Sequence, residues 1–352
     1  MSLFCTSARR RRATGSPQRP RSAFTLVELL VVIGIIAILV SVLLPALSAA
    51  RKASNNVKCQ ANLRSIVQAM NMYVVESKGW LPGSALTTGY PAWKGTQAKC
   101  PQVSHINDWQ APIAKIMRIR FNEAGDLASR TERFVYLMNR PEFNCPNNDL
   151  IAEPLGTPTF PATRAQSYVL AVQFMYETNG GKWASTDVDV GEHTTYQFHD
   201  PPSGYVPKIT KVGPPQRKIY IACGAKYTDA TTASVRMPLT LRYDWGGAFG
   251  DRGPWYNANK AWDRSQAPGN GGTSSFDPRV LSYKHGKTFP KGPADTFRFN
   301  AGFFDGHVEA MGDLEGSDPA LWNPKGTHIV GHLFNDVAKR FYGGTQPDIY
   351  VP

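Results

Sequence analysis

The first 23 residues contain no aspartate or glutamate, and six arginines there supply half of the formal net charge of +12. Without this leader the chain carries a net charge of +6, spread along the sequence with no basic block. Nucleic-acid-binding proteins usually concentrate their positive charge in one patch or stripe. We therefore predict no nucleic-acid partner.

The sequence also lacks the short motifs of common enzymes. It has no Gly-x-Ser-x-Gly nucleophile elbow, no His-Glu-x-x-His pair and no glycine-rich phosphate loop before a helix. We therefore predict a protein that is not an enzyme and that needs no cofactor.

One stretch has almost no charge and is strongly apolar. Phe24 to Leu44 is 21 residues long, and at about 1.5 Å per residue a helix of this length just crosses a hydrocarbon layer of about 30 Å. Its single ionisable residue is Glu28, which in lipid costs on the order of 3 kcal/mol without a partner. The arginine-rich leader would stay cytoplasmic and send the C-terminal part across the membrane.

The basic leader, the small residue Ala23 and the string Phe24-Thr-Leu-Val-Glu28 resemble the class III signal of type IV pilins and type II secretion pseudopilins. The resemblance implies cleavage between Ala23 and Phe24 by a prepilin peptidase and N-methylation of Phe24. It also implies that Glu28 is the membrane glutamate of the family, and Pro45 its helix-kinking or locally melting proline. The family favours Gly where this chain has Ala23.

The Phe24 amine of a neighbouring subunit is a natural counter-charge for Glu28, which would set the stagger of subunits in a filament. The alternative is that Glu28 only reaches the cytoplasmic headgroups.

A second helical segment follows Pro45. Residues 46–77 contain no Pro or Gly, and apolar residues recur there at helical spacing on one face, namely Leu63, Ile66, Val67, Met70 and Val74. Gly79 and Pro82 would end this helix. We predict a leader at 1–23, a transmembrane helix at 24–44, the periplasmic half of the same helix at 45–78, and a globular domain with long loop insertions at 79–352.

The globular part shows both helix and strand patterns. Helices are predicted at 112–122 and 128–138, the second capped by Ser129 or Thr131, and strands at 167–174 and 218–223. The predicted fold is α+β and pilin-like, with the long helix packed on an antiparallel sheet.

After the leader, which contains Cys5, four cysteines remain: Cys59, Cys100, Cys145 and Cys223. No pair has Cys-x-x-Cys spacing and no His stands beside them at zinc-ligand spacing, so the pattern predicts no metal site. In an exported domain they could form two disulfides in three connectivities. Cys59-Gln-Ala-Asn-Leu-Arg and the string Phe143-Asn-Cys-Pro146 resemble motifs of large pseudopilin-like proteins of planctomycetes, and this resemblance implies a Cys59–Cys145 disulfide.

The last motif is a His followed by an Asp-Gly pair. Asp305-Gly306 between short apolar stretches predicts a hairpin, and with His285 and His307 it resembles the C-terminal motif of the same proteins, with a longer spacer here. We expect His285 to hydrogen-bond the turn carboxylate or backbone. The alternative is a calcium ion held by Asp305 and Glu309.

Together these features predict a structural subunit of a type II secretion or type IV pilus-like filament. Its partners would be other pilin subunits, the prepilin peptidase and methyltransferase, and an inner-membrane assembly platform. One alternative is an exported protein that binds glycans with an aromatic loop, comprising Trp245, Trp255, Tyr256, Trp262 and Asp263. Another is a secreted protein with an ordinary signal peptide cut near Ala49 or Ala50.

Overall fold

The computed structural model describes residues 25–84, 108–148, 151–155, 163–164, 166–175, 177–179, 182–184, 199–200, 202–224, 236–238, 249–256, 283–286 and 297–352. Several residues singled out from the sequence lie outside these ranges: Ala23, Phe24, Cys100, Trp245, Trp262 and Asp263. The chain forms two compact units, Met1–Arg51 and Lys52–Pro352.

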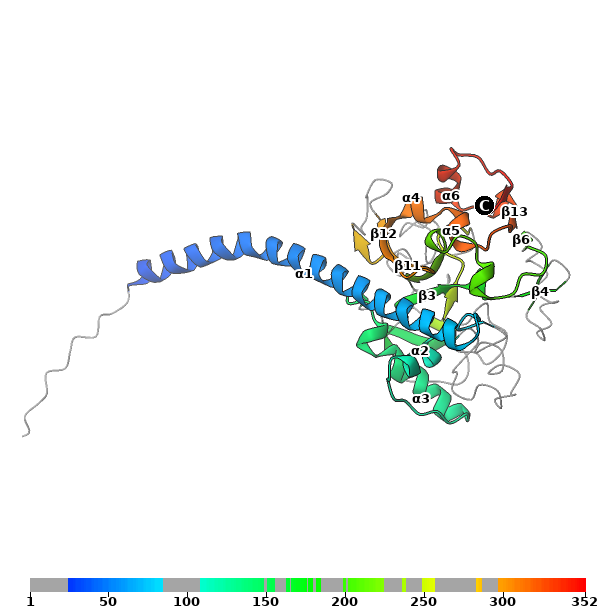
Figure 1. Ribbon diagram of the computed structural model, residues 1–352. Helices are drawn as coiled ribbons and strands as arrows, with labels where there is room; N and C mark the ends of the chain where they lie inside the picture. The colour runs from blue at the N-terminus through cyan, green and yellow to red at the C-terminus, as the bar shows by residue number, and fades with distance from the viewer. Residues whose placement is uncertain are drawn as a thin grey trace, which may run out of the picture. The chain divides into compact units, whose positions relative to one another are not determined.

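The first unit contains the beginning of helix α1, which runs from Leu26 to Glu76 (Figure 1). The described side chains of this first unit are all exposed, including the apolar ones from Leu26 to Leu47. Pro45 lies inside α1, and the helix continues through it although proline removes one helical hydrogen bond. Among the described residues, α1 is the helix long and apolar enough to cross a membrane.

In the second unit, the rest of α1 has one buried face. Its five apolar residues predicted to share a face, Leu63, Ile66, Val67, Met70 and Val74, are buried together with Cys59. The helix ends before Lys78 and Gly79, which both adopt positive φ. The amide of Gly79 donates to the carbonyl of Val74 at 2.7 Å, which closes the last turn.

The main sheet of this unit has the strand order β10-β11-β7-β3-β9, and β12 also pairs with β11. The bounds are β3 Tyr168–Ala171, β7 Ile219–Cys223, β9 Gly250–Asp251, β10 His285–Gly286, β11 Phe297–Phe303 and β12 Val308–Gly312. All pairings are antiparallel except that of β3 with β9. A long apolar helix with a mostly antiparallel sheet confirms the predicted α+β pilin-like fold.

The described residues also form smaller sheets and short helices. One small sheet contains β1 (Ile151–Leu155), β2 (Thr163–Arg164) and β8 (Arg236–Pro238). A second contains β6 (His199–Asp200), β13 (His328–Ile329) and β14 (Ile349–Tyr350), and a third contains β4 (Glu177–Asn179) and β5 (Lys182–Ala184). The short helices are α2 Gln110–Ile116, α3 Leu127–Met138, α4 Asp313–Gly316, α5 Pro319–Trp322 and α6 Asp336–Phe341, with 3-10 turns at η2 Pro141–Phe143, η3 Val172–Phe174, η5 Ile209–Lys211, η6 Pro215–Arg217 and η9 Gly331–Leu333.

Two details of the helices differ from the sequence expectation. α2 ends at Ile116 instead of continuing to 122, because Arg118 adopts a left-handed conformation with φ of 59°. α3 is capped by Asp126, whose side chain accepts a hydrogen bond from the amide of Ser129 at 3.0 Å. Ser129 therefore receives the cap instead of providing it.

Candidate functional site

The start of α1 forms a reciprocal capping box between Thr25 and Glu28. The amide and hydroxyl of Thr25 donate to Glu28 Oε2 at 2.9 and 2.8 Å, and the amide of Glu28 donates to Thr25 Oγ1 at 3.2 Å. This arrangement satisfies two of the amides that a helix N-terminus leaves unpaired. The Thr-x-x-Glu spacing in the sequence is the signal for this capping box. From the sequence we considered the charge of Glu28 and not its capping role.

Four side chains that are far apart in the sequence meet inside the second unit: Cys59, Cys145, Cys223 and His285. They offer three sulfur atoms and one imidazole nitrogen, all within 4.8 Å of one another. The three cysteines are fully buried and His285 is 4% exposed. We call these four residues the Cys3His cluster.

The cluster is assembled from four separate elements. Cys59 lies on the buried face of α1, and Cys145 follows η2 in the turn of the Phe-x-Cys-Pro string. Cys223 is the last residue of β7, and His285 is the first residue of β10. Each element contributes a single cysteine or histidine to the cluster. For this reason the spacing of the cysteines in the sequence predicted no metal site.

The contacts within the cluster centre on the imidazole. His285 Nε2 lies 3.5 Å from Cys145 Sγ and 3.7 Å from Cys223 Sγ. The hydroxyl of Tyr168 donates to Cys59 Sγ at 3.6 Å. On the other side of the ring, Asn147 Nδ2 lies 3.3 Å from His285 Nδ1 and donates to the carbonyl of Lys284 at 3.0 Å.

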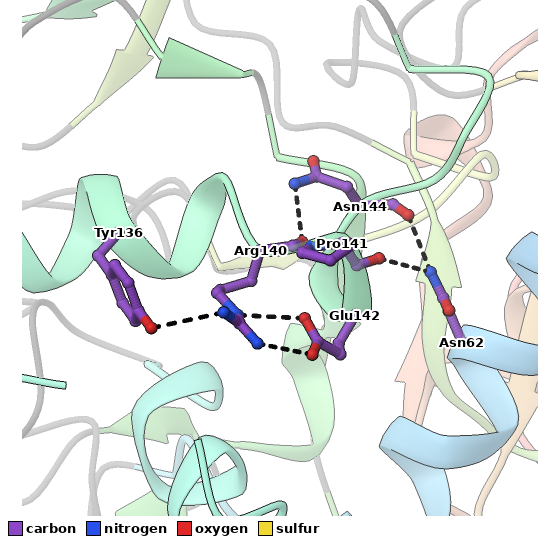
Figure 2. A network of polar contacts seen from close by, with 6 residues as sticks. All are labelled: Asn62, Tyr136, Arg140, Pro141, Glu142 and Asn144. Carbon is purple, nitrogen blue, oxygen red and sulfur yellow. Dashed lines mark hydrogen bonds and ion pairs between the residues drawn. The ribbon is translucent and has the colours of Figure 1, made fainter. Parts of the chain in front are cut away.

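Asn62 holds the Cys145 loop against α1. Its side-chain amide donates to the carbonyls of Pro141 and Asn144 at 2.8 and 2.9 Å (Figure 2). Asn62 is the Asn of the Cys-x-x-Asn-Leu motif, so the two sequence motifs are in direct contact. The motif therefore places Cys59 and fixes the loop that brings Cys145 to it.

The base of this loop is stiffened by an ion pair. Arg140 donates to both carboxylate oxygens of Glu142, at 2.7 and 3.2 Å, and approaches the hydroxyl of Tyr136 at 3.5 Å (Figure 2). Asn144 Nδ2 donates back to the carbonyl of Arg140 at 2.9 Å. These contacts fix the backbone that directly precedes Cys145.

The environment moves the thiol pKa values in opposite directions. Hydrogen bonds from Cys223 and Cys59 and the nearby His285 lower the pKa of Cys145, which favours its thiolate. Burial raises the pKa of Cys59 to about 12 and raises that of Cys223 well above its usual value. Cys145 is therefore the cysteine of the cluster that ionises most easily.

The disulfide that the family resemblance implied is not formed. Cys59 and Cys145 are free cysteines in the structure, as is Cys223. Because three sulfurs share one small space with an imidazole, a Cys59–Cys145 bond would leave Cys223 as an unpaired thiol beside it. Cys100 lies outside the described residues.

The C-terminal hairpin forms as predicted, but His285 does not take part in its turn. Gly306 adopts φ of 102° between β11 and β12, and Asp305 Oδ1 accepts from the amide of His307 at 3.1 Å and lies 2.6 Å from its Nδ1. His285 pairs with Arg298 near the start of β11, whereas the turn follows its end. The residue that contacts Asp305 is therefore His307.

The carboxylates proposed as calcium ligands flank the same imidazole. Glu309 Oε2 lies 3.9 Å from His307 Nε2, on the side opposite the Asp305 contact. Both carboxylates thus face an imidazole nitrogen, a ligand type that calcium does not favour.

Trp255, the central residue of the proposed glycan-binding loop, lies in the core. It is fully buried and packs edge-on against Tyr256 and Phe334, at centroid distances of 5.6 and 6.4 Å. Arg252 covers the ring of Tyr256 at 4.3 Å. A buried indole offers no face to a sugar, so Trp255 has a packing role.

Two comparisons with known proteins give a match. Residues 18–44 match the pattern of the prokaryotic N-terminal methylation motif. The chain is 43% identical over 67 residues to the type IV wide pilus major component PilA4 of Thermus thermophilus, an alignment that covers 19% of this chain and 51% of that protein. The chain thus spans about half the length of this relative. No solved structure matches.

The methylation motif coincides with the start of the one described helix that could cross a membrane, and this combination fits a single-pass membrane anchor. The chain that shares this sequence identity with a pilus component also has an α+β fold. By the motif at residues 18–44 and by its identity to PilA4, the chain is similar to type IV pilins.

Proposed function

We propose that this chain is a subunit of a type IV pilus-like or type II secretion filament that is assembled from the inner membrane. The observation that carries the proposal is the match of residues 18–44 to the methylation motif, directly at the start of an exposed apolar helix. Such a surface is stable in lipid or against identical helices, and not in water.

In this proposal a prepilin peptidase removes residues 1–23 and the new amine of Phe24 is methylated. Residues 24–44 hold the subunit in the inner membrane, 45–78 continue the helix on the periplasmic side, and 79–352 form the globular domain that covers the filament. Assembly would use a platform and energy source supplied by other proteins. The chain itself performs mechanical work and no chemistry.

Glu28 has two tasks in this scheme. In the single subunit its carboxylate is held by Thr25, which reduces the cost of keeping it near the membrane surface. In the filament it would accept the Phe24 amine of a neighbouring subunit, so that the two charges neutralise each other. When the subunit joins the filament, Glu28 would therefore exchange its contact with Thr25 for one with the Phe24 amine of the neighbour.

The chemical identity of the mature N-terminus tests the proposal. Protein purified from the cell envelope of the native host should begin with N-methylated Phe24 by mass spectrometry of the N-terminal peptide. A variant with Phe24 replaced by Asp should retain the leader if the peptidase cuts at this position. A mature chain that starts near Arg51 would overturn the proposal, because it would lack the membrane helix.

A further inference from the structure

We propose that Cys59, Cys145, Cys223 and His285 bind one Zn²⁺ ion in a closed tetrahedral site that cross-links the globular unit. The inference does not depend on filament assembly, since all four residues belong to the unit Lys52–Pro352. It rests on geometry, ligand type and burial.

The distances in the cluster match the edges of a zinc tetrahedron. With Zn–S of about 2.3 Å and Zn–N of about 2.0–2.1 Å, a sulfur and a nitrogen ligand lie about 3.5 Å apart and two sulfurs about 3.8 Å apart. His285 Nε2 lies 3.5 and 3.7 Å from two of the sulfurs, and all four ligand atoms lie within 4.8 Å of one another. Only small side-chain movements are therefore needed to close the site around an ion.

The ligand set selects zinc. Thiolates and imidazole are soft to borderline ligands that favour Zn²⁺ over Ca²⁺ or Mg²⁺, and three Cys with one His is a standard composition of structural zinc sites. Four protein ligands complete the tetrahedron and leave no position for water or substrate. The site is therefore structural and does not carry out catalysis.

A bound ion would offset negative charge inside the buried cluster. The three thiols and the imidazole are buried together, and bound Zn²⁺ would compensate the charge of the three thiolates except for one unit. The Tyr168 hydroxyl, which already donates to Cys59 Sγ, is placed to stabilise this remaining charge. Binding releases the thiol protons to solvent, so affinity should increase with pH.

Asn147 acts as a positioning residue for the imidazole. Coordination through Nε2 requires the ring proton to be on Nδ1, where it needs an acceptor. Asn147 presents Nδ2 to Nδ1 at 3.3 Å, while its Oδ1 accepts from Asn55 at 2.8 Å. Turning the Asn147 oxygen toward the ring would break its hydrogen bonds with Asn55 and with the carbonyl of Lys284, so zinc binding through Nε2 requires these groups to rearrange together.

The ion would join parts of the unit that have no covalent link near the site. It connects α1, the turn after η2, the end of β7 and the start of β10. A disulfide could join only two of these segments. Zinc would thereby fix the helix to the sheet at the centre of the unit.

Metal analysis of the full chain tests the inference. Detergent-solubilised protein prepared without chelator should contain one zinc per chain, and its three cluster thiols should react with a thiol reagent only after the metal is removed. Replacement of zinc by Co²⁺ should produce the visible absorption bands of tetrahedral thiolate coordination. Removal of the metal should lower the melting temperature of the unit.

Variants separate zinc binding from simple packing. Cys145→Ser and His285→Ala should weaken zinc binding by more than the roughly 10- to 100-fold typical of changes to residues that only orient a ligand, and Asn147→Ala should fall within that range. His285→Cys keeps four ligands and should retain the metal, and Cys100→Ser should retain it as well. Because His285→Cys and His285→Ala both remove the imidazole, a difference between them cannot come from lost packing of the ring.

Two results would overturn the inference. One is a peptide map of the mature protein that shows a disulfide between any two of the three cluster cysteines. The other is reduced, folded wild-type chain that takes up no stoichiometric zinc or cobalt when the metal ion is supplied in excess.

Discussion

Val67 of α1 lies directly over Gly302 of β11. A Cβ atom built on Gly302 would stand 2.5 Å from Val67 Cγ2 and 3.3 Å from Ile221 Cγ2. The first distance is far below van der Waals contact, so only glycine lets the helix approach the sheet this closely. The close approach also sets the depth at which Cys59, two turns earlier on α1, meets the sheet.

Gly302→Ala should therefore destabilise the second unit by about 1–3 kcal/mol, the usual cost of an added carbon in a well-packed core. Denaturant unfolding of the full chain in detergent, followed by near-UV circular dichroism, measures this change. Gly34→Ala is a suitable control because nothing lies within 4 Å of its added Cβ. Combining Gly302→Ala with Val67→Ala should cost less than the sum of the single changes, and strict additivity would contradict the contact.

Asn62→Ala should loosen the loop that carries Cys145. The carbonyls of Pro141 and Asn144 would each lose a side-chain donor, and we expect a loss of about 1–3 kcal/mol in unfolding free energy. Ser65→Ala, on the exposed side of α1, removes one hydrogen bond to the carbonyl of Ala61 and should cost less than about 0.5 kcal/mol. Equal effects of the two substitutions, measured by the same denaturation assay, would show that Asn62 does not anchor the loop.

Substitutions at the start of α1 distinguish the charge of Glu28 from its capping role. Glu28→Gln keeps an acceptor for Thr25 but removes the charge, whereas Thr25→Ala keeps the charge and breaks the capping box. If Glu28 pairs with a neighbouring amine, Glu28→Gln should abolish incorporation into filaments while Thr25→Ala reduces it only mildly. Immunoblots of sheared filaments and of membranes give both amounts. The reverse order would assign Glu28 to helix capping alone.

The sequence predicted the elements that depend on local patterns. The apolar run, the amphipathic half of α1, the strand predicted at 218–223 and the hairpin at Asp305-Gly306 all have a local composition, periodicity or turn signal, and all are present. The strand predicted at 167–174 is shorter in the structure, because it ends at Ala171 and Val172–Phe174 forms a 3-10 turn. The end of α2 was missed because a left-handed Arg118 leaves no mark in the sequence.

The cluster could not be predicted because it depends on tertiary contacts. Cys59, Cys145, Cys223 and His285 come from four segments, and no two of them have the spacing of a known ligand pair. Family resemblance placed Cys59 near Cys145, and the two are indeed close, but it implied a disulfide where the structure has free thiols. The hydrogen bonds from Asn62 to the loop that carries Cys145 could not be predicted either, because they join residues that are 79 and 82 positions apart.

Trp255→Ala should act on stability and not on sugar binding. The indole is fully buried between Tyr256 and Phe334, so its removal leaves a large cavity that costs about 3–5 kcal/mol. A lowered melting temperature is the expected result. Glycan arrays probed with folded wild-type chain provide the opposing case: binding that Trp255→Ala abolishes without loss of stability would restore the glycan-binding alternative.

Lys218 should make the stability of the second unit depend on pH in the alkaline range. Its side chain is buried and donates to the carbonyl of Ala320 at 2.7 Å, and burial, helped by the charges of Arg217 and Lys325, lowers its pKa from 10.5 to about 8 against the opposing charge of Asp318. Between these two values the unfolded chain binds more protons than the folded one, so this group's contribution to the unfolding free energy rises with pH across the interval.

Lys218→Met removes that contribution. The difference in unfolding free energy between wild type and Lys218→Met should therefore shift in favour of the wild type by on the order of 1–3 kcal/mol between about pH 7 and pH 10. Measuring the difference cancels the titration of the cysteines and tyrosines that both proteins share. Lys211→Met, at an exposed lysine in η5, should give a pH profile parallel to that of the wild type. Parallel profiles for wild type and Lys218→Met would mean that Lys218 titrates alike in the folded and unfolded chain, and that the buried ammonium is fully compensated by the carbonyl of Ala320 and the charge of Asp318.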